Sequence, residues 1–213
     1  MGSRIEPDKF NSSAIHEKCL EIFEKKHWVP FFEKFDGYNE KVSWEFSHPF
    51  DGERATIGNF TFRLSEDILA QIIGLPQQGE RFFKTKQFEE KAWVPFLCRS
   101  REGSMKWKKG VPRSWLIHPW DAMAYIIQKS LTYEGRFSII YLYHIKLMQH
   151  LSGDCEINIP YFLPQSLSKM AKAIQKRTGD TTSSIFHCGL IKIILTHESQ
   201  KQSLTWQQFC SSL

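Results

Sequence analysis

The sequence has no long apolar run and no closely spaced pair of cysteines. The longest apolar stretches, 139–147 and 185–195, each contain a Lys or a His and are shorter than the roughly 20 residues that cross a bilayer. The five cysteines are odd in number and form no CxxC pair, and residues 1–10 are too polar for a secretory signal peptide. We therefore expect no membrane span, no disulfides, and an intracellular protein, nuclear or cytoplasmic.

Several motifs that carry chemistry are also missing. The chain has no GxGxxG, no GxxxxGK[ST], no HExxH and no GxSxG, which are the patterns of phosphate loops, zinc sites and nucleophile elbows. Two glycines, Gly74 and Gly79, flank a short loop, but this loop follows a predicted helix, whereas phosphate loops follow a strand. We expect neither a metal nor a cofactor. The pattern favours a protein that is not an enzyme, although catalytic groups can also assemble in space.

What the sequence does have is enough apolar and aromatic material for a core. It contains 213 residues, of which 41% are hydrophobic and 14% aromatic, so disorder is excluded. Helical spacing predicts helices over 13–26, 30–35 and 39–48. Two alternating runs joined by Gly58-Asn59 predict a β-hairpin. Ser65 and Gly74 have the chemistry of a helix N-cap and a left-handed helix end.

The second half of the chain is predicted to be helical. We expect helices over 120–131, 137–151, 165–176 and 182–196, of which 137–151 and 182–196 are apolar enough to be buried, and an extended segment over 157–162. The fold class is mainly α, a helical bundle with one small β-hairpin in the N-terminal half. The expected divisions are an N-terminal helical subdomain over 1–98, a basic loop over 99–112 and a C-terminal bundle over 113–213, which can also form one continuous domain.

Positive charge is concentrated in the middle of the chain. Between Lys84 and Arg113 lie nine basic and three acidic residues, a net charge of +6, so the rest of the chain sums to −1 against a total of +5. Lysines, arginines and tryptophans that interleave suit single-stranded DNA or RNA, and the alternative is a solvated loop anchored by its tryptophans. The candidate nucleic-acid-binding residues are Lys84, Lys86, Lys91, Arg99, Arg101, Lys106, Trp107, Lys108, Lys109 and Arg113.

A second set of candidates would line a pocket between the two halves. Titratable or polar side chains in apolar surroundings often mark such pockets. The candidates on this criterion are His118, Tyr143, His144 and His187. The alternative for each of them is a hydrogen-bonded residue of the core or the surface.

One long stretch resembles a known family. "FFEKFDGYNEKVSWEFSHPFDGERATIGNFTFRLSEDILAQIIGLPQQGERFFK" is similar to an uncharacterised plant domain associated with transposable elements and retroelement-like reading frames. The family pattern falls on 35–39, 50–58, 64–80 and 82–84, and the similarity extends from about 31 to 195. The resemblance implies a plant source and a nuclear setting, and it carries over no catalytic residue. The leading hypothesis is a non-enzymatic binding domain of transposable-element origin that binds nucleic acid or a protein partner, and the alternative is an enzyme or a small-ligand-binding protein.

Overall fold

A computed structural model describes residues 14–35, 37, 39–58, 60–82, 94–96, 110–132, 137–176 and 187–211. Over these ranges the chain forms nine α-helices and two antiparallel sheets of two strands each. This confirms the predicted mainly α-helical fold with a small hairpin. No helix within the described ranges is long and apolar enough to cross a membrane.

Three short helices open the described part of the chain: α1 (Ala14–Lys25), α2 (Val29–Glu33) and α3 (Glu40–Ser47). They confirm the three helices predicted there. The side chain of Asn39 accepts a hydrogen bond from the backbone N–H of Val42 at 3.2 Å, which caps α3 in the expected way. Trp28 and Phe31 are fully buried and fix the turn from α1 to α2 against the core.

The predicted hairpin follows. Strand β1 (Arg54–Ile57) pairs with β2 (Phe60–Arg63), and Ile57 lies opposite Phe60, so the turn has two residues. Helix α4 (Glu66–Ile73) comes next, with the Ser65 hydroxyl accepting from the Ile68 N–H at 3.2 Å. It ends at Gly74, whose φ of +77° is the left-handed conformation that stops a helix. Local chemistry therefore predicted both ends of α4.

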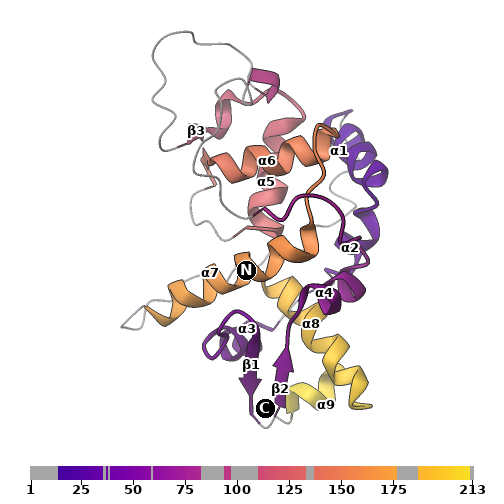
Figure 1. Ribbon diagram of the computed structural model, residues 1–213, viewed down its shortest axis with the longest axis vertical. Coiled ribbons are helices and arrows are strands. Elements are labelled where there is room, and N and C mark those ends of the chain that lie inside the picture. Colours follow the sequence, from indigo (N-terminus) through magenta and orange to yellow (C-terminus); the bar gives the residue numbers. More distant parts are fainter. Residues whose placement is uncertain are drawn as a thin grey trace.

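The core is organised around one long helix, which crosses the middle of the molecule in Figure 1. Helix α7 (Ile159–Gln175) buries Phe162, Leu163 and Leu167 completely. Above it in the view lie α5 (Trp120–Ser130) and α6 (Leu142–Ser152), which pack together; below it lie α8 (Cys188–Lys201) and α9 (Trp206–Ser211) with the hairpin. Helices α3 and α4 from the N-terminal half contact both α7 and α8.

The structure corrects the prediction of one helix over 137–151. Helix α6 begins only at Leu142, and Ile139–Ile140 form a short strand, β4, paired with β3 (Val111–Pro112). The side-chain amide of Gln128 also donates to the Ile139 carbonyl at 2.8 Å. Isoleucine is as suited to a strand as to a buried helix, and the pairing partner is too distant in sequence for periodicity to reveal it.

Two other boundaries differ from the prediction. Residues 159–162 are the first turn of α7, not an extended segment, because Pro160 occupies a position where no N–H is needed, and Asn158 caps the helix by accepting from the Tyr161 N–H at 2.9 Å. Helix α8 begins at Cys188 and continues to Lys201, later than the predicted range of 182–196; residues 181–186 lie outside the described ranges. Between residues 83 and 109 the structure describes only Val94–Phe96, a single 3₁₀ turn.

The family-like motif around Gly79 forms a joint between the two halves. The Glu80 N–H donates to the Glu156 carbonyl at 2.8 Å, and the Asn158 N–H donates to the Glu80 carbonyl at 3.0 Å. The side-chain amide of Asn158 also donates to Glu66 at 2.6 Å. This part of the motif is therefore architectural, since it attaches the start of α4 and the loop after it to the segment that leads into α7.

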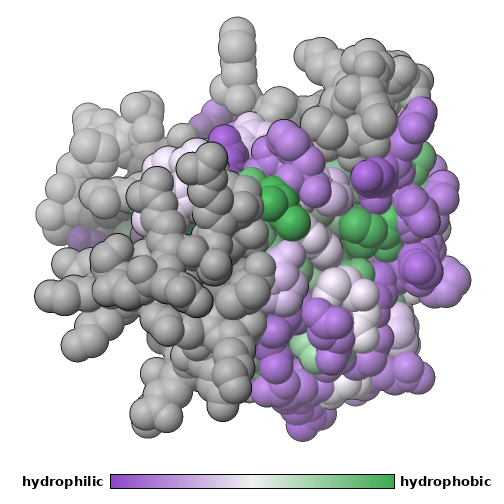
Figure 2. Space-filling model, turned by 90° about the horizontal axis from the view of Figure 1, so that it is seen from above, coloured by the Kyte–Doolittle hydropathy of each residue, from purple (hydrophilic) through white to green (hydrophobic). Residues whose placement is uncertain are grey.

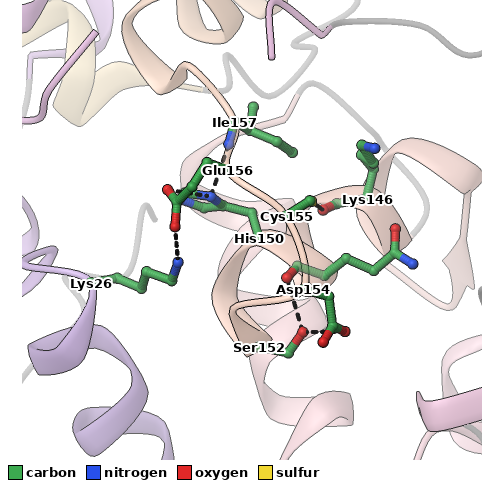
Figure 3. Close-up of polar contacts among 9 residues, drawn as sticks. Lys26, Lys146, His150, Ser152, Asp154, Cys155, Glu156 and Ile157 are labelled. Atoms are coloured by element: carbon green, nitrogen blue, oxygen red, sulfur yellow. Dashed lines mark hydrogen bonds and ion pairs between the residues drawn. The ribbon is translucent and has the colours of Figure 1, made fainter. Parts of the chain in front are cut away.

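A lysine and a histidine flank Glu156 at the same joint (Figure 3). The Glu156 carboxylate lies between Lys26, at 2.6 Å, and the buried ring of His150, at 3.5 Å. His150 Nδ1 accepts a hydrogen bond from the Ile157 N–H at 3.0 Å, so this nitrogen carries no proton. Burial lowers the pKa of His150 to about 4. The histidine is thus a neutral acceptor that holds the backbone of the joint.

Candidate functional site

Most of the predicted nucleic-acid-binding residues lie outside the described ranges. These are Lys84, Lys86, Lys91, Arg99, Arg101, Lys106, Trp107, Lys108 and Lys109. Their role, and the boundaries proposed at 98 and 112, stay predictions. Arg113 is described, and it stands at the start of a 3₁₀ turn (Arg113–Trp115) directly after β3.

Arg113 belongs to a group of cations and aromatic rings. Its guanidinium carbon lies 5.0 Å from the centroid of the Tyr125 ring. Lys129 Nζ lies 5.7 Å from the same centroid and 4.6 Å from that of Phe137. The rings of Tyr125 and Phe137 meet edge to face at 5.8 Å. We call Arg113, Tyr125, Lys129 and Phe137 the Arg113 cluster.

Two features of the fold assemble this cluster. Tyr125 and Lys129 are four residues apart on α5 and therefore share one face of the helix. The pairing of Pro112 with Ile139 brings the chain after β3 beside the chain before β4, and the Arg113 N–H donates to the Ser138 carbonyl at 2.8 Å. A sequence reading identified Arg113 but missed its three neighbours, whose only signal was an aromatic and a basic residue at helical spacing.

The Arg113 cluster is also partly open to solvent. Large apolar side chains that are exposed in the described part of the chain are Leu20, Trp44 and Tyr125, on three different helices, and Tyr125 is 40% exposed. Figure 2 shows one face of the molecule, on which the described residues are mainly hydrophilic with small separate apolar areas. Neither Arg113 nor Lys129 forms an ion pair with any described residue. Their charges are thus not neutralised by a described carboxylate.

The four pocket candidates do not form one pocket. His118 is on the surface, where Nδ1 lies 2.6 Å from the Asp121 carboxylate. Tyr143, half-buried on α6, has its ring 4.1 Å from that of His144 and carries Lys169 Nζ at 5.1 Å. His144 contacts Thr132, just after α5, and His187 contacts the carbonyl of Ser130, the last residue of α5. The structure therefore brings three of the four near one helix end and leaves His118 apart.

His144 is a structural residue of the core. Its Nδ1 accepts from the Tyr141 N–H at 3.0 Å, so its Nε2 donates to the Thr132 hydroxyl at 3.1 Å. Burial, and the charge of Lys169, lower the pKa of this histidine to about 3. The ring is neutral at physiological pH and has a hydrogen bond on both nitrogens.

His187 contacts Ser166 in an arrangement that resembles a catalytic Ser–His pair, but both residues are buried. The Ser130 carbonyl lies 3.2 Å from Nδ1, which must therefore carry the proton, and Nε2 accepts from the Ser166 hydroxyl at 3.0 Å. Burial lowers the pKa of His187 to about 4. This order of groups matches a nucleophile, a base and an orienting acceptor. However, Ser166 is only 1% exposed, so no substrate reaches it in this conformation.

The described thiols are poor nucleophiles. Burial raises the pKa of Cys19 and of Cys188 to about 11, and it also raises the pKa of Cys155 and of Cys210. These thiols are protonated at neutral pH, and the protonated form does not attack. Among the described residues, no three His, Cys, Asp or Glu side chains are grouped so that they could hold a metal ion.

A groove that the sequence did not predict lies between the two halves. It has a volume of about 770 Å³ and is lined by α2, α4, α8, α9 and the residues that follow α2 and precede α9. Its lining includes two lysines, Lys34 and Lys192, one glutamate, Glu33, and the ring of Trp206. Most of its other lining residues are Gln and Thr. No sequence motif marks it, because four separate helices contribute to it.

The fold and these sites define a mainly α-helical protein with two surface features, a cation–aromatic cluster and a polar groove. No family model, no curated protein and no solved structure matches this chain.

Proposed function

We propose that this chain is a non-enzymatic binding domain of transposable-element origin whose partner is single-stranded nucleic acid. The observation that carries the proposal is the Arg113 cluster, which places two cations around a partly exposed tyrosine, neither of them paired with a carboxylate among the described residues. It stands at the described end of the segment that holds the chain's excess positive charge.

The chemistry of the cluster suits a nucleic-acid strand. Arg113 and Lys129 attract phosphates, and the partly exposed ring of Tyr125 offers a surface on which a base stacks. Stacking of one base on an aromatic side chain contributes roughly 1–3 kcal/mol. The other eight basic residues of 84–113 would add to the salt-dependent attraction for the backbone.

The titratable groups of the described core support binding over catalysis. His144, His150 and His187 are neutral and occupied by structural hydrogen bonds. The thiols hold their protons at neutral pH. These three histidines and the described thiols are therefore committed to the fold.

The experiment is a fluorescence-anisotropy titration of labelled poly-dT and poly-U 12-mers with the full chain at two salt concentrations. We expect binding that weakens by orders of magnitude between roughly 50 and 200 mM salt. Lys129→Gln is expected to weaken binding and to reduce the salt slope by about one unit. Lys41→Gln, which removes the same charge from an exposed site on α3, serves as the matched control. No binding at low salt, or equal effects of the two variants, would refute the proposal.

A further inference from the structure

The groove between α2, α4, α8 and α9 has the size of a small-molecule site. Its volume of about 770 Å³ lies within the range of roughly 300–1,000 Å³ that is usual for ligand pockets. Both halves of the chain contribute to it: Lys34 and Gln71 come from the N-terminal half, and Lys192 and Trp206 from the C-terminal half.

The apolar part of the groove is held in place by the core. Ile72 is buried, Ile193 is half-buried, and Trp206 packs its ring on the fully buried Phe209, with ring centroids 5.9 Å apart. Trp206 is itself only partly buried. The groove thus offers a planar aromatic wall whose orientation is set before any ligand arrives.

The polar part carries more positive than negative charge. Lys34 and Lys192 contribute two cations and Glu33 one anion. Lys34 Nζ donates to the Ile72 carbonyl at 2.7 Å, a contact that holds its ammonium at the end of α4. Glutamine and threonine side chains around it can donate hydrogen bonds to oxygens.

A half-buried histidine also lines the groove. His197 lines it, and its Nε2 is buried with no hydrogen-bond partner among the described residues. Burial lowers the pKa of His197, and the charges of Lys201 and Lys34 lower it further, against the opposite effect of Glu198. Of these causes, only the positive charges of Lys201 and Lys34 also favour an anion nearby.

We infer that this groove binds a small anionic ligand with a planar apolar part. The ring of the ligand would lie on Trp206, and its phosphate or carboxylate would lie between Lys34 and Lys192. This site is separate from the Arg113 cluster, which none of the groove-lining residues belongs to.

The test is isothermal titration calorimetry of the full chain with three probes: adenosine monophosphate, indole-3-acetate and inorganic phosphate. We expect adenosine monophosphate or indole-3-acetate to bind more tightly than inorganic phosphate. The tighter of these two ligands shows whether the groove prefers a phosphate or a carboxylate. Thr196→Glu, which adds a negative charge to an accessible position of the groove, is expected to abolish this binding. Lys192→Met is expected to weaken it about tenfold, as the loss of one charge-assisted contact does, and Lys41→Met, on α3, should have no effect.

Two results would overturn the inference. One is the absence of binding by both planar anions up to about 1 mM, the weak end of measurable small-molecule affinity. The other is binding that Thr196→Glu leaves unchanged. Binding that Lys129→Gln removes, and Thr196→Glu does not, would place the nucleotide on the Arg113 cluster instead, so the two proposals fail in different ways.

Discussion

The backbone of Gly79 lies directly against that of Glu156. A Cβ atom added to Gly79 would be 2.4 Å from the Glu156 carbonyl carbon and 2.5 Å from its oxygen, and the φ of Gly79 is +95°. Both atoms belong to the peptide that accepts the Glu80 N–H. The loop after α4 can therefore approach this segment only because residue 79 has no side chain.

Gly79→Ala is accordingly expected to destabilise the fold more than the same change at Gly153. Gly153 has an almost equal φ of +94°, but nothing lies within 4 Å of its added Cβ. Gly153→Ala should cost ~1–2 kcal/mol, the penalty for a left-handed backbone, and Gly79→Ala about 2 kcal/mol more because the backbone must move. Urea unfolding of both variants measures the difference, and equal losses would contradict the close approach.

Acid should destabilise the protein through its buried histidines. The folded pKa values of His144 and His187, about 3 and about 4, lie below the ordinary value of 6.5, so the unfolded chain binds protons that the folded chain does not. The stability that these neutral rings contribute is complete above pH 6.5. It is lost as the pH falls toward 4, by up to about 1.4 kcal/mol per pH unit for each histidine.

His187→Asn tests the pH dependence, since Asn tolerates the left-handed conformation that His187 adopts, with φ of 63°. The variant should be less stable than the parent at pH 7, because it loses the hydrogen bond between the Ser166 hydroxyl and His187 Nε2. Its stability should change less than that of the parent between pH 6.5 and 4.5. A variant with the parent's full acid slope would show that His187 titrates normally in the folded chain.

At the joint around Glu156, replacing the buried ring of His150 should lower the free energy of unfolding more than removing the exposed Lys26–Glu156 ion pair. The Glu156 side chain is 60% exposed, so Glu156→Gln should cost less than about 1 kcal/mol. His150→Leu keeps most of the buried volume but leaves the Ile157 N–H without its acceptor, a loss of roughly 1–3 kcal/mol. Chemical denaturation ranks the two, and the reverse order would mean that the ion pair, not the buried acceptor, holds the joint.

The described thiols should fall into two groups by their rate of alkylation in the folded protein. Cys19 and Cys188 are buried and have a pKa of about 11, so iodoacetamide at pH 8 should modify them only after unfolding. Cys155 and Cys210 are half-buried and should react earlier. Peptide mass spectrometry over time measures the order. Modification of Cys19 in the folded protein at the rate of Cys210 would contradict the described burial.

Sequence reasoning succeeded where a structure depends on neighbouring residues. The caps at Asn39 and Ser65, the helix end at Gly74 and the hairpin turn at 58–59 all follow from chemistry within a few positions of the chain. It failed where the deciding partner is far away. The strand at Ile139–Ile140 depends on Val111–Pro112, and the need for glycine at position 79 depends on Glu156.

In the candidate sites, too, the sequence indicated local properties but not the distant partners. His144 and His187 were expected in apolar surroundings, and both are buried, but their partners Thr132 and Ser166 have no mark in the sequence. The groove has none either, because its charges and its aromatic wall come from α2 and the residue after it, from α8 and from α9. Composition could locate the excess of positive charge but not the ring of Tyr125, on α5, against which Arg113 packs.

The attachment points of the basic segment have a consequence for its evolution. Phe82, Phe96 and Val111 are all buried; Phe82 stacks on Phe162, Phe96 meets Trp120 edge to face, and Val111 pairs with Ile140. The core therefore holds the chain just before the basic segment, within it and close to its end. A change of length between Phe82 and Phe96, or between Phe96 and Val111, would leave all three core contacts in place.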